Sequence, residues 1–157
     1  LLEYAIKNNP DKIFIITGPA FDEMGIKGLD NYKNVKLFLE MIIHEEKPYL
    51  YSRFDIGIMP HITGDFIKSM DPIKLYEFLA AGKPVVTTPV SGVEQFKDLI
   101  YIAADKKDFS DSLGLAAGEK NKEEMKEKRL ESVEDRGWKK RIDKIFKSMK
   151  REYDQHT

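Results

Sequence analysis

Short apolar segments alternate with helical patterns along the chain up to about residue 105. Each apolar segment is continuously hydrophobic over four or five residues, which is typical of strands covered on both faces in a parallel sheet. The expected strands are residues 13–17, 35–39, 55–59, 85–88 and 99–103, and the helical segments between them are 44–53, 72–82, 92–97 and 106–118. This order predicts an α/β fold with a doubly wound, Rossmann-like parallel sheet of about five to six strands and helices on both faces.

The C-terminal part of the chain loses strand character and predicts a helical tail over residues 122–157. Residues 122–136 mix charges of both signs, which favours a solvated helix over a binding arm. The last helix, over 137–153, carries one narrow apolar stripe. The stripe consists of Trp138, Ile142, Ile145, Phe146 and Met149. We expect it to pack on this domain or on a neighbouring one, and we expect residues 1–157 to form a single domain.

The segment from Pro72 to Gly82 is the most informative feature of the sequence. It is apolar apart from Lys74 and Glu77, in a chain that is 34% charged. Asp71 is the expected N-cap and Pro72 the first helical residue, while Gly82 should end the helix. Lys74 would then lie in the first turn, where unpaired backbone N–H groups attract phosphate.

Lys74 and Glu77 are three residues apart and therefore leave the same face of that helix. One interpretation is an ordinary ion pair at the solvated edge of the helix. The other is a ligand site, because ligands of open parallel sheets bind beyond the carboxyl ends of the strands. Three loops are expected there, at 18–23, 60–71 and 89–94, and the middle one leads directly into Lys74 and Glu77. This position favours the ligand site.

Composition narrows the function classes. The net charge of -1 provides no basic field for nucleic acid, and the absence of cysteine excludes disulfides and thiol nucleophiles. No apolar run is long enough to span a bilayer, so a cytoplasmic location is expected. The chain lacks an initial Met, and we expect it to be part of a longer protein.

Several common motifs are absent from the sequence. Neither G-x-G-x-x-G nor a P-loop occurs, and no G-x-S-x-G elbow provides a nucleophile. The three histidines, His44, His61 and His156, are too scattered for a helical metal pair, so no metal is implied. His61 follows the third expected strand, where it could be a surface residue or meet a ligand. Recognition of a phosphate and a sugar is the chemistry that remains.

The stretch Asp71-Pro-Ile-Lys-Leu-Tyr-Glu-Phe-Leu-Ala-Ala-Gly-Lys-Pro-Val-Val-Thr-Thr88 closely resembles the C-terminal domain of GT-B glycosyltransferases. Residues 13–19 resemble the first strand and glycine turn of that family, residues 55–60 its third strand and residues 137–142 its closing helix. The resemblance implies the half of the enzyme that binds the nucleotide-sugar donor.

The resemblance also implies roles for individual residues. Glu77 matches the glutamate that holds the nucleotide ribose, and Lys74 would stabilise the charge of the departing diphosphate, a catalytic role. The turn at Gly18 would approach the donor phosphates or sugar, and Met41 and Ile42 would meet the base through backbone groups. The donor-binding residues implied in this way are Gly18, Met41, Ile42, Lys74, Leu75 and Glu77. The nucleoside-diphosphate sugar is a substrate, so no cofactor or metal is required.

Two positions depart from the family pattern. Many retaining members carry a glutamate that touches the donor hexose eight positions before the ribose glutamate, and Ser69 stands there. The glycine that commonly follows the second strand is replaced by Glu40. A relative without the usual hexose contact, or a domain without activity, is compatible with these differences.

The first hypothesis is therefore a hexosyltransferase of polysaccharide biosynthesis that uses a saccharide or lipid-linked acceptor and needs a missing N-terminal domain. Alone, this part should bind donor weakly and be inactive. Nucleic acid is not an expected partner, and membrane association, at the inner face, would come only through the missing half or the acceptor. The alternatives are a nucleotide-sugar epimerase of the same fold or a non-catalytic α/β partner-binding module. The second is disfavoured because Gly18-Pro19 replaces the acidic cluster of a receiver domain.

Overall fold

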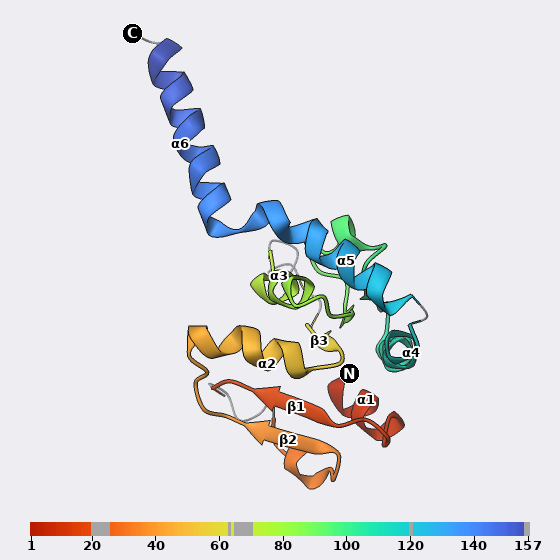
Figure 1. The fold of residues 1–157 in the computed structure, drawn as a ribbon. Helices are drawn as coiled ribbons and strands as arrows, with labels where there is room; N and C mark the ends of the chain where they lie inside the picture. Colours follow the sequence, from red (N-terminus) through yellow and green to blue (C-terminus); the bar gives the residue numbers. More distant parts are fainter. Residues whose placement is uncertain (20–25, 63, 65–70, 120, 156–157) are drawn as a thin grey trace.

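The structure is a computed structural model that describes residues 1–19, 26–62, 64, 71–119 and 121–155 (Figure 1). In these residues, parallel strands form two sheets. β1 (Phe14–Thr17) pairs with β2 (Val35–Phe38), and β3 (Gly57–Met59), β4 (Val85–Thr87) and β5 (Tyr101–Ile102) form the second sheet in that order. The register places Phe14 opposite Val35 and Gly57 opposite Val85. The predicted α/β class with parallel strands is confirmed.

The two sheets share one hydrophobic core although their strands form separate hydrogen-bonded ladders. Phe14 and Val35 from the first sheet belong to the same buried cluster as Val86 and Ala103 at the second sheet. The sequence predicted one continuous sheet, whereas the described strands form two separate sheets. Strands of two to four residues provide few ladder hydrogen bonds, so side-chain packing joins the two halves.

Helices pack against the strands and contribute to two hydrophobic clusters. α1 (Leu2–Asn8) and α4 (Lys106–Ala117) pack together, and both contribute to the first core cluster. α2 (Lys47–Arg53), α3 (Ile73–Ala80) and α5 (Lys122–Val133) contribute to the second cluster, which contains Tyr51, Leu75, Phe78 and Leu79. The remaining helices are η2 (Leu29–Asn31), η3 (His44–Glu46), η5 (Glu94–Phe96), η6 (Glu134–Arg136) and α6 (Trp138–Gln155). The segment expected as a helix at 92–97 is the short 3-10 turn η5.

The two ends of α3 differ in how well the sequence predicted them. Pro72, not Asp71, is the N-cap, and the Asp71 carboxylate accepts a hydrogen bond from the Tyr76 hydroxyl at 2.8 Å instead. The prediction of Asp71 as cap was therefore wrong. The end was predicted correctly: Gly82 has φ +68°, and its N–H donates to Leu79 O at 2.9 Å while Lys83 N–H donates to Phe78 O at 3.0 Å. This is the Schellman arrangement that glycine favours.

Burial differs between the sheets. All three residues of β4 are buried, as expected for a strand covered on both faces. In β1 and β2, Phe14 and Val35 face the core, but Ile15 and Phe38 on the opposite face are exposed. The expectation of double coverage is wrong for this first sheet. α3 is also less buried than its composition indicated, because Ile73 and Lys74 face solvent.

α6 extends away from the rest of the protein (Figure 1). Its beginning is held near α3, where the Arg141 guanidinium lies 4.0 Å from the Asp71 carboxylate and over the Tyr76 ring. The apolar stripe predicted on this helix is 45% to 71% exposed, so it is not buried against this domain. Among the described helices, none is both long enough and apolar enough to cross a membrane.

Gly57 provides a test of the packing between α3 and β3. A Cβ atom at this position would lie 2.5 Å from Cγ of the buried Phe78 ring. We predict that Gly57→Ala lowers the free energy of unfolding by about 2 kcal/mol, because neither the strand nor the ring can move without disturbing the core. Urea unfolding followed by circular dichroism measures the change.

Gly114, inside α4, is the matched control, because a Cβ atom there meets no heavy atom within 4 Å. Gly114→Ala should raise stability by about 0.5 to 1 kcal/mol through helix propensity. Equal effects of the two substitutions would contradict the packing interpretation.

Candidate functional site

The charged pair that the sequence singled out lies near the beginning of α3, the helix that follows the carboxyl end of β3. The Lys74 ammonium lies 3.2 Å from Oε2 of Glu77, so the two side chains do share a face. Lys74 is 57% exposed, whereas Glu77 is only 19% exposed. The carboxylate is therefore the partly buried member, and the ammonium is the member that faces solvent.

α2 completes this cluster with two further side chains. The Tyr51 hydroxyl donates a hydrogen bond to Oε2 of Glu77 at 2.7 Å and accepts one from the Lys74 ammonium at 2.7 Å. The Lys47 ammonium lies 3.8 Å from the other carboxylate oxygen, Oε1. Tyr51 is itself buried, and its ring packs 5.0 Å from the Phe78 ring. A rigid phenol therefore fixes the orientation of the Glu77 carboxylate.

This environment keeps Glu77 ionised. Burial alone would raise the pKa of Glu77, but hydrogen bonds from Tyr51 and Lys74 and the charges of Lys74 and Lys47 outweigh it and hold the pKa below its ordinary value. Burial also opposes the charge of Lys74, yet the pKa of Lys74 is raised by its hydrogen bonds to Tyr51 and Glu77. At neutral pH the cluster is an ammonium and a carboxylate joined by a neutral phenol, whose own pKa is raised by burial.

A pocket of about 350 Å³ opens beside Glu77, between α2 and α3. It is lined by His44, Lys47, Pro48, Tyr51, Ser52, Glu77, Ala80 and Ala81. Glu77 Oε1 has spare acceptor capacity here, because its described partner Lys47 is 3.8 Å away. The site thus combines an acceptor-only group, a nearby cation and apolar walls, which suits a ligand with hydroxyl donors and an apolar ring.

The other residues implied by the resemblance lie at different places. Gly18 follows β1 with φ +109°, its N–H donates to Phe38 O at 3.0 Å, and open space lies above its Cα. Met41 and Ile42 follow β2, and the Met41 side chain is exposed. Leu75 is buried in the core, with no exposed surface. Among these predicted residues, Glu77 alone lines the pocket described above.

The sequence also drew attention to His61, Glu40 and Ser69. His61 follows β3, its carbonyl accepts a hydrogen bond from the Thr88 hydroxyl at 3.0 Å, and partial burial lowers its pKa. Glu40 is exposed after β2. Ser69 lies outside the described residues. The structure therefore does not test the expectation that this chain lacks the usual contact to the donor hexose. Within the described ranges, no group of three or more His, Asp or Glu residues is arranged to hold a metal ion.

Tyr51 and Lys47 were not predicted from the sequence. They are four residues apart in the helix expected at 44–53 and therefore share a face. That helix and the helix carrying Glu77 contact each other. The helical spacing was a usable signal, but which helix face meets α3 depends on the tertiary packing.

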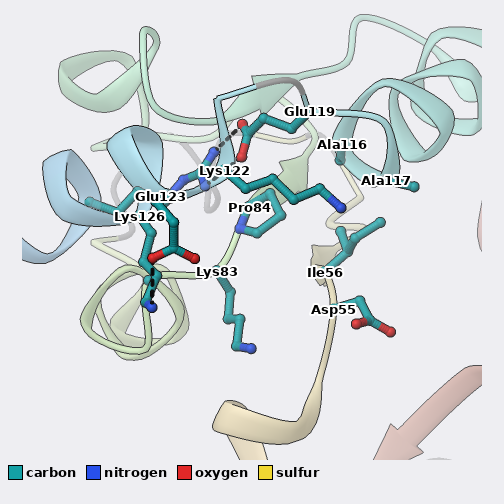
Figure 2. Close-up of a pocket in the computed structure, with 12 residues that line it drawn as sticks. Asp55, Ile56, Lys83, Pro84, Ala116, Ala117, Glu119, Lys122, Glu123 and Lys126 are labelled. Carbon is teal, nitrogen blue, oxygen red and sulfur yellow. Dashed lines mark hydrogen bonds and ion pairs between the residues drawn. The ribbon is translucent and has the colours of Figure 1, made fainter.

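A second pocket, of about 190 Å³, lies at the opposite edge of the sheet (Figure 2). Asp55, Ile56 and Pro84, which precede β3 and β4, line it together with residues of α4 and α5. Two of its charged groups are paired with each other: the Arg129 guanidinium donates to Glu119 at 2.5 and 2.9 Å, and it also donates to Leu99 O at 2.9 Å. Arg129 is only 1% exposed. We interpret this second pocket as the structural contact that attaches α5 to the domain. It lies at the edge of the sheet away from the predicted ligand.

The family model described as "Glycosyl transferases group 1" matches residues 4–119. The "Putative teichuronic acid biosynthesis glycosyltransferase TuaH" of Bacillus subtilis (strain 168) is 28% identical over 144 residues, which cover 88% of this chain and 36% of that protein. The chain thus spans about a third of the length of this curated relative.

The family match covers well over half of the chain, from α1 through α4. The chain therefore belongs to the group 1 glycosyltransferases. This confirms the resemblance to the C-terminal domain of GT-B glycosyltransferases that was based on residues 71–88.

Acid should selectively remove the contribution of Glu77 to stability. Its folded-state pKa is below the ordinary value of 4.5, so the carboxylate stabilises the fold fully above pH 4.5 and loses this effect as the pH falls through the folded pKa. We predict that Glu77→Gln costs about 1 kcal/mol at neutral pH and progressively less in acid. Urea unfolding across this pH range measures the difference.

Glu127→Gln on the exposed face of α5 is the control for a general charge effect. It should change stability little at any of these pH values. A Glu77→Gln difference that stays constant from neutral pH into acid would contradict the ionic role of Glu77.

We expect Arg129, in the second pocket, to anchor α5 to the rest of the domain. Arg129→Ala would leave the partly buried Glu119 without its cation, and we expect a loss of about 3 kcal/mol in unfolding free energy. Lys128→Ala, which removes an exposed ion pair to Glu124, should cost less than about 1 kcal/mol. Similar small losses for both variants would show that α5 is not anchored through Arg129.

Proposed function

We propose that this chain is the donor-binding part of a glycosyltransferase that transfers a sugar from a nucleoside diphosphate to a saccharide or lipid-linked acceptor. The membership of the group 1 glycosyltransferases gives the reaction class. The observation that carries the assignment of the site is the ionised, oriented carboxylate of Glu77 beside an open pocket. The name of the Bacillus relative supports an acceptor of the polysaccharide class.

Glu77 is the group that we assign to the ribose. The vicinal hydroxyls of a ribose are hydrogen-bond donors, and a carboxylate has acceptor capacity on both oxygens. Oε2 is held by Tyr51 at 2.7 Å, and Oε1 faces Lys47 at 3.8 Å. Tyr51 therefore fixes the carboxylate from one side and leaves Oε1 to receive a hydroxyl. Because the Tyr51 phenol already orders the Glu77 side chain, a ligand does not lose free energy by ordering it, and the site is preorganised.

Lys74 is the group that we assign to the diphosphate. Its ammonium lies in the first turn of α3, where unpaired N–H groups also favour negative charge, and more than half of its surface is exposed. In the transfer reaction the bond between the sugar and the diphosphate breaks, and negative charge grows on the departing diphosphate. A fixed cation at that position stabilises this charge and lowers the barrier.

The remaining parts of the activity are assigned to regions outside these residues. We expect the acceptor, and any group that activates it, to come from an N-terminal domain. The described chain would then bind donor weakly and have no turnover by itself. Gly18 and the backbone of Met41 and Ile42 follow β1 and β2, so they are proposed to meet the donor phosphates or sugar and the base.

Titration with UDP, GDP and ADP by calorimetry tests this proposal. We expect at least one nucleoside diphosphate to bind, and we expect Glu77→Ala to weaken that binding about tenfold through loss of the ribose hydrogen bonds. Tyr51→Phe should weaken it less, because the carboxylate remains but is no longer held.

Glu127→Ala is the matched control, since it removes an exposed glutamate from α5 without touching the pocket. Its affinity should equal that of the parent. Unchanged affinity in Glu77→Ala would overturn the ribose assignment, and binding of none of the three nucleotides would overturn the donor site as a whole.

A further inference from the structure

The Glu77 carboxylate has an ammonium on each side, and the two sides differ. On the Oε2 side, Lys74 lies 3.2 Å away, and the Tyr51 hydroxyl bridges the pair with a hydrogen bond of 2.7 Å to each partner. On the Oε1 side, Lys47 of α2 lies 3.8 Å away. This distance is longer than a hydrogen bond, so Lys47 attracts Oε1 by charge and leaves its lone pairs available.

The Oε2 side shows which chemical group fits between an ammonium and this carboxylate. The Tyr51 O–H donates to Glu77 while its oxygen accepts from Lys74, because a hydroxyl both donates and accepts hydrogen bonds. The same arrangement is possible at Oε1, since two hydrogen bonds of about 2.8 Å through one oxygen can span the 3.8 Å that separate Lys47 from Oε1. In that position an ammonium would meet Lys47 and a phosphate oxygen would meet Glu77, each with like charge. A neutral hydroxyl suits both groups.

The hydroxyl groups of the pocket lining are engaged elsewhere. The Tyr51 hydroxyl is bonded at Oε2, and Ser52 Oγ donates to Tyr49 O at 2.6 Å. Lys47 and Glu77 both line the pocket, where they are 29% and 19% exposed. Partial shielding from water strengthens the attraction of such a charged pair for a polar group. A ligand in this pocket is therefore the source of a hydroxyl that would bridge the pair.

We propose that Lys47 and Glu77 together recognise one ribose hydroxyl of the donor: the hydroxyl donates to Oε1 of Glu77 and accepts from the Lys47 ammonium. This inference rests on the proposed function, which places a ribose in this site. It adds a residue from a second helix that distinguishes a ribonucleotide from a deoxyribonucleotide. A carboxylate alone accepts from any donor, whereas the added cation requires the same group to accept as well.

A phosphate contact is the alternative role for Lys47, and Lys74 suits that role better. Lys74 is 57% exposed, compared with 29% for Lys47, so its ammonium can meet a phosphate on its solvent side. It also lies in the first turn of α3, where backbone N–H groups add to the attraction for phosphate.

Nucleotides that lack one ribose hydroxyl test this inference. Calorimetric titrations would compare UDP, GDP and ADP with the 2′-deoxy and 3′-deoxy forms of each. For a base that binds, we expect one of the two deoxy forms to bind the parent about tenfold more weakly, because two hydrogen bonds to charged groups are lost. In Lys47→Met, which keeps most of the side-chain length but removes the ammonium, this ratio should fall to about threefold.

Lys12→Met is the matched control. The Lys12 side chain is 24% exposed, close to the value for Lys47, and its ammonium pairs with the Asp11 carboxylate at 3.0 Å outside the pocket lining. This substitution should leave the affinities for the ribonucleotide and the deoxyribonucleotide as in the parent, and therefore also their ratio. Circular dichroism verifies that both variants are folded.

The outcomes separate this inference from the proposed function. A Lys47→Met variant that keeps the tenfold ratio, with weaker or unchanged affinity for the ribonucleotide, would overturn the role of Lys47 and leave the donor site in place. If the parent binds both deoxy forms as well as the ribonucleotide, the ribose assignment of Glu77 is wrong, and the inference fails with it. Binding of none of the nucleotides would overturn the donor site as a whole.

Discussion

The close approach of α3 to β3 is the constraint on which the candidate site depends. Gly57 has no side chain, and the Phe78 ring occupies the space where a Cβ atom would lie. This contact fixes the rotation of α3 about its own axis. Because Phe78 faces the sheet, its neighbour Glu77 is directed sideways toward α2, where the Tyr51 hydroxyl meets it at 2.7 Å. The orientation of the Glu77 carboxylate in the candidate site thus follows from the packing of the neighbouring residue, Phe78.

Phe78 also packs against the aromatic residues that hold the cluster of Lys74, Tyr51 and Glu77 rigid. Tyr51 from α2 and Phe54, which directly follows this helix, pack against Phe78, with ring centroids 5.0 and 6.5 Å away. A phenol held in this way has little rotational freedom, so its hydroxyl can bridge Lys74 and Glu77 with a constant geometry. The core and the candidate site are therefore continuous, and a change in the core of this layer would move the charges of the site.

The sequence predicted those parts of the fold that depend on local pattern. The continuous apolar runs located all five described strands to within two residues, and Gly82 marked the end of α3. The sequence failed where a competing side chain or the tertiary packing decides the outcome. Asp71 looked like an N-cap, but the Tyr76 hydroxyl takes its carboxylate. Ile15 looked buried, but the outer face of β1 and β2 is exposed in the described structure. For the site, the pair of Lys74 and Glu77 was visible as two charges on an apolar helix, whereas Tyr51 and Lys47 depended on which face of α2 meets α3.

The placement of α6 has an electrical consequence for the whole molecule. With +4 on this helix, the rest of the chain has five more acidic than basic residues. Since α6 extends from one end (Figure 1), these opposite charges are separated in space and give the molecule a large permanent dipole moment. Such a dipole experiences a torque in the field of any charged body, so the molecule turns before it makes contact. Its near-neutral total charge conceals a strong preference for one orientation of approach.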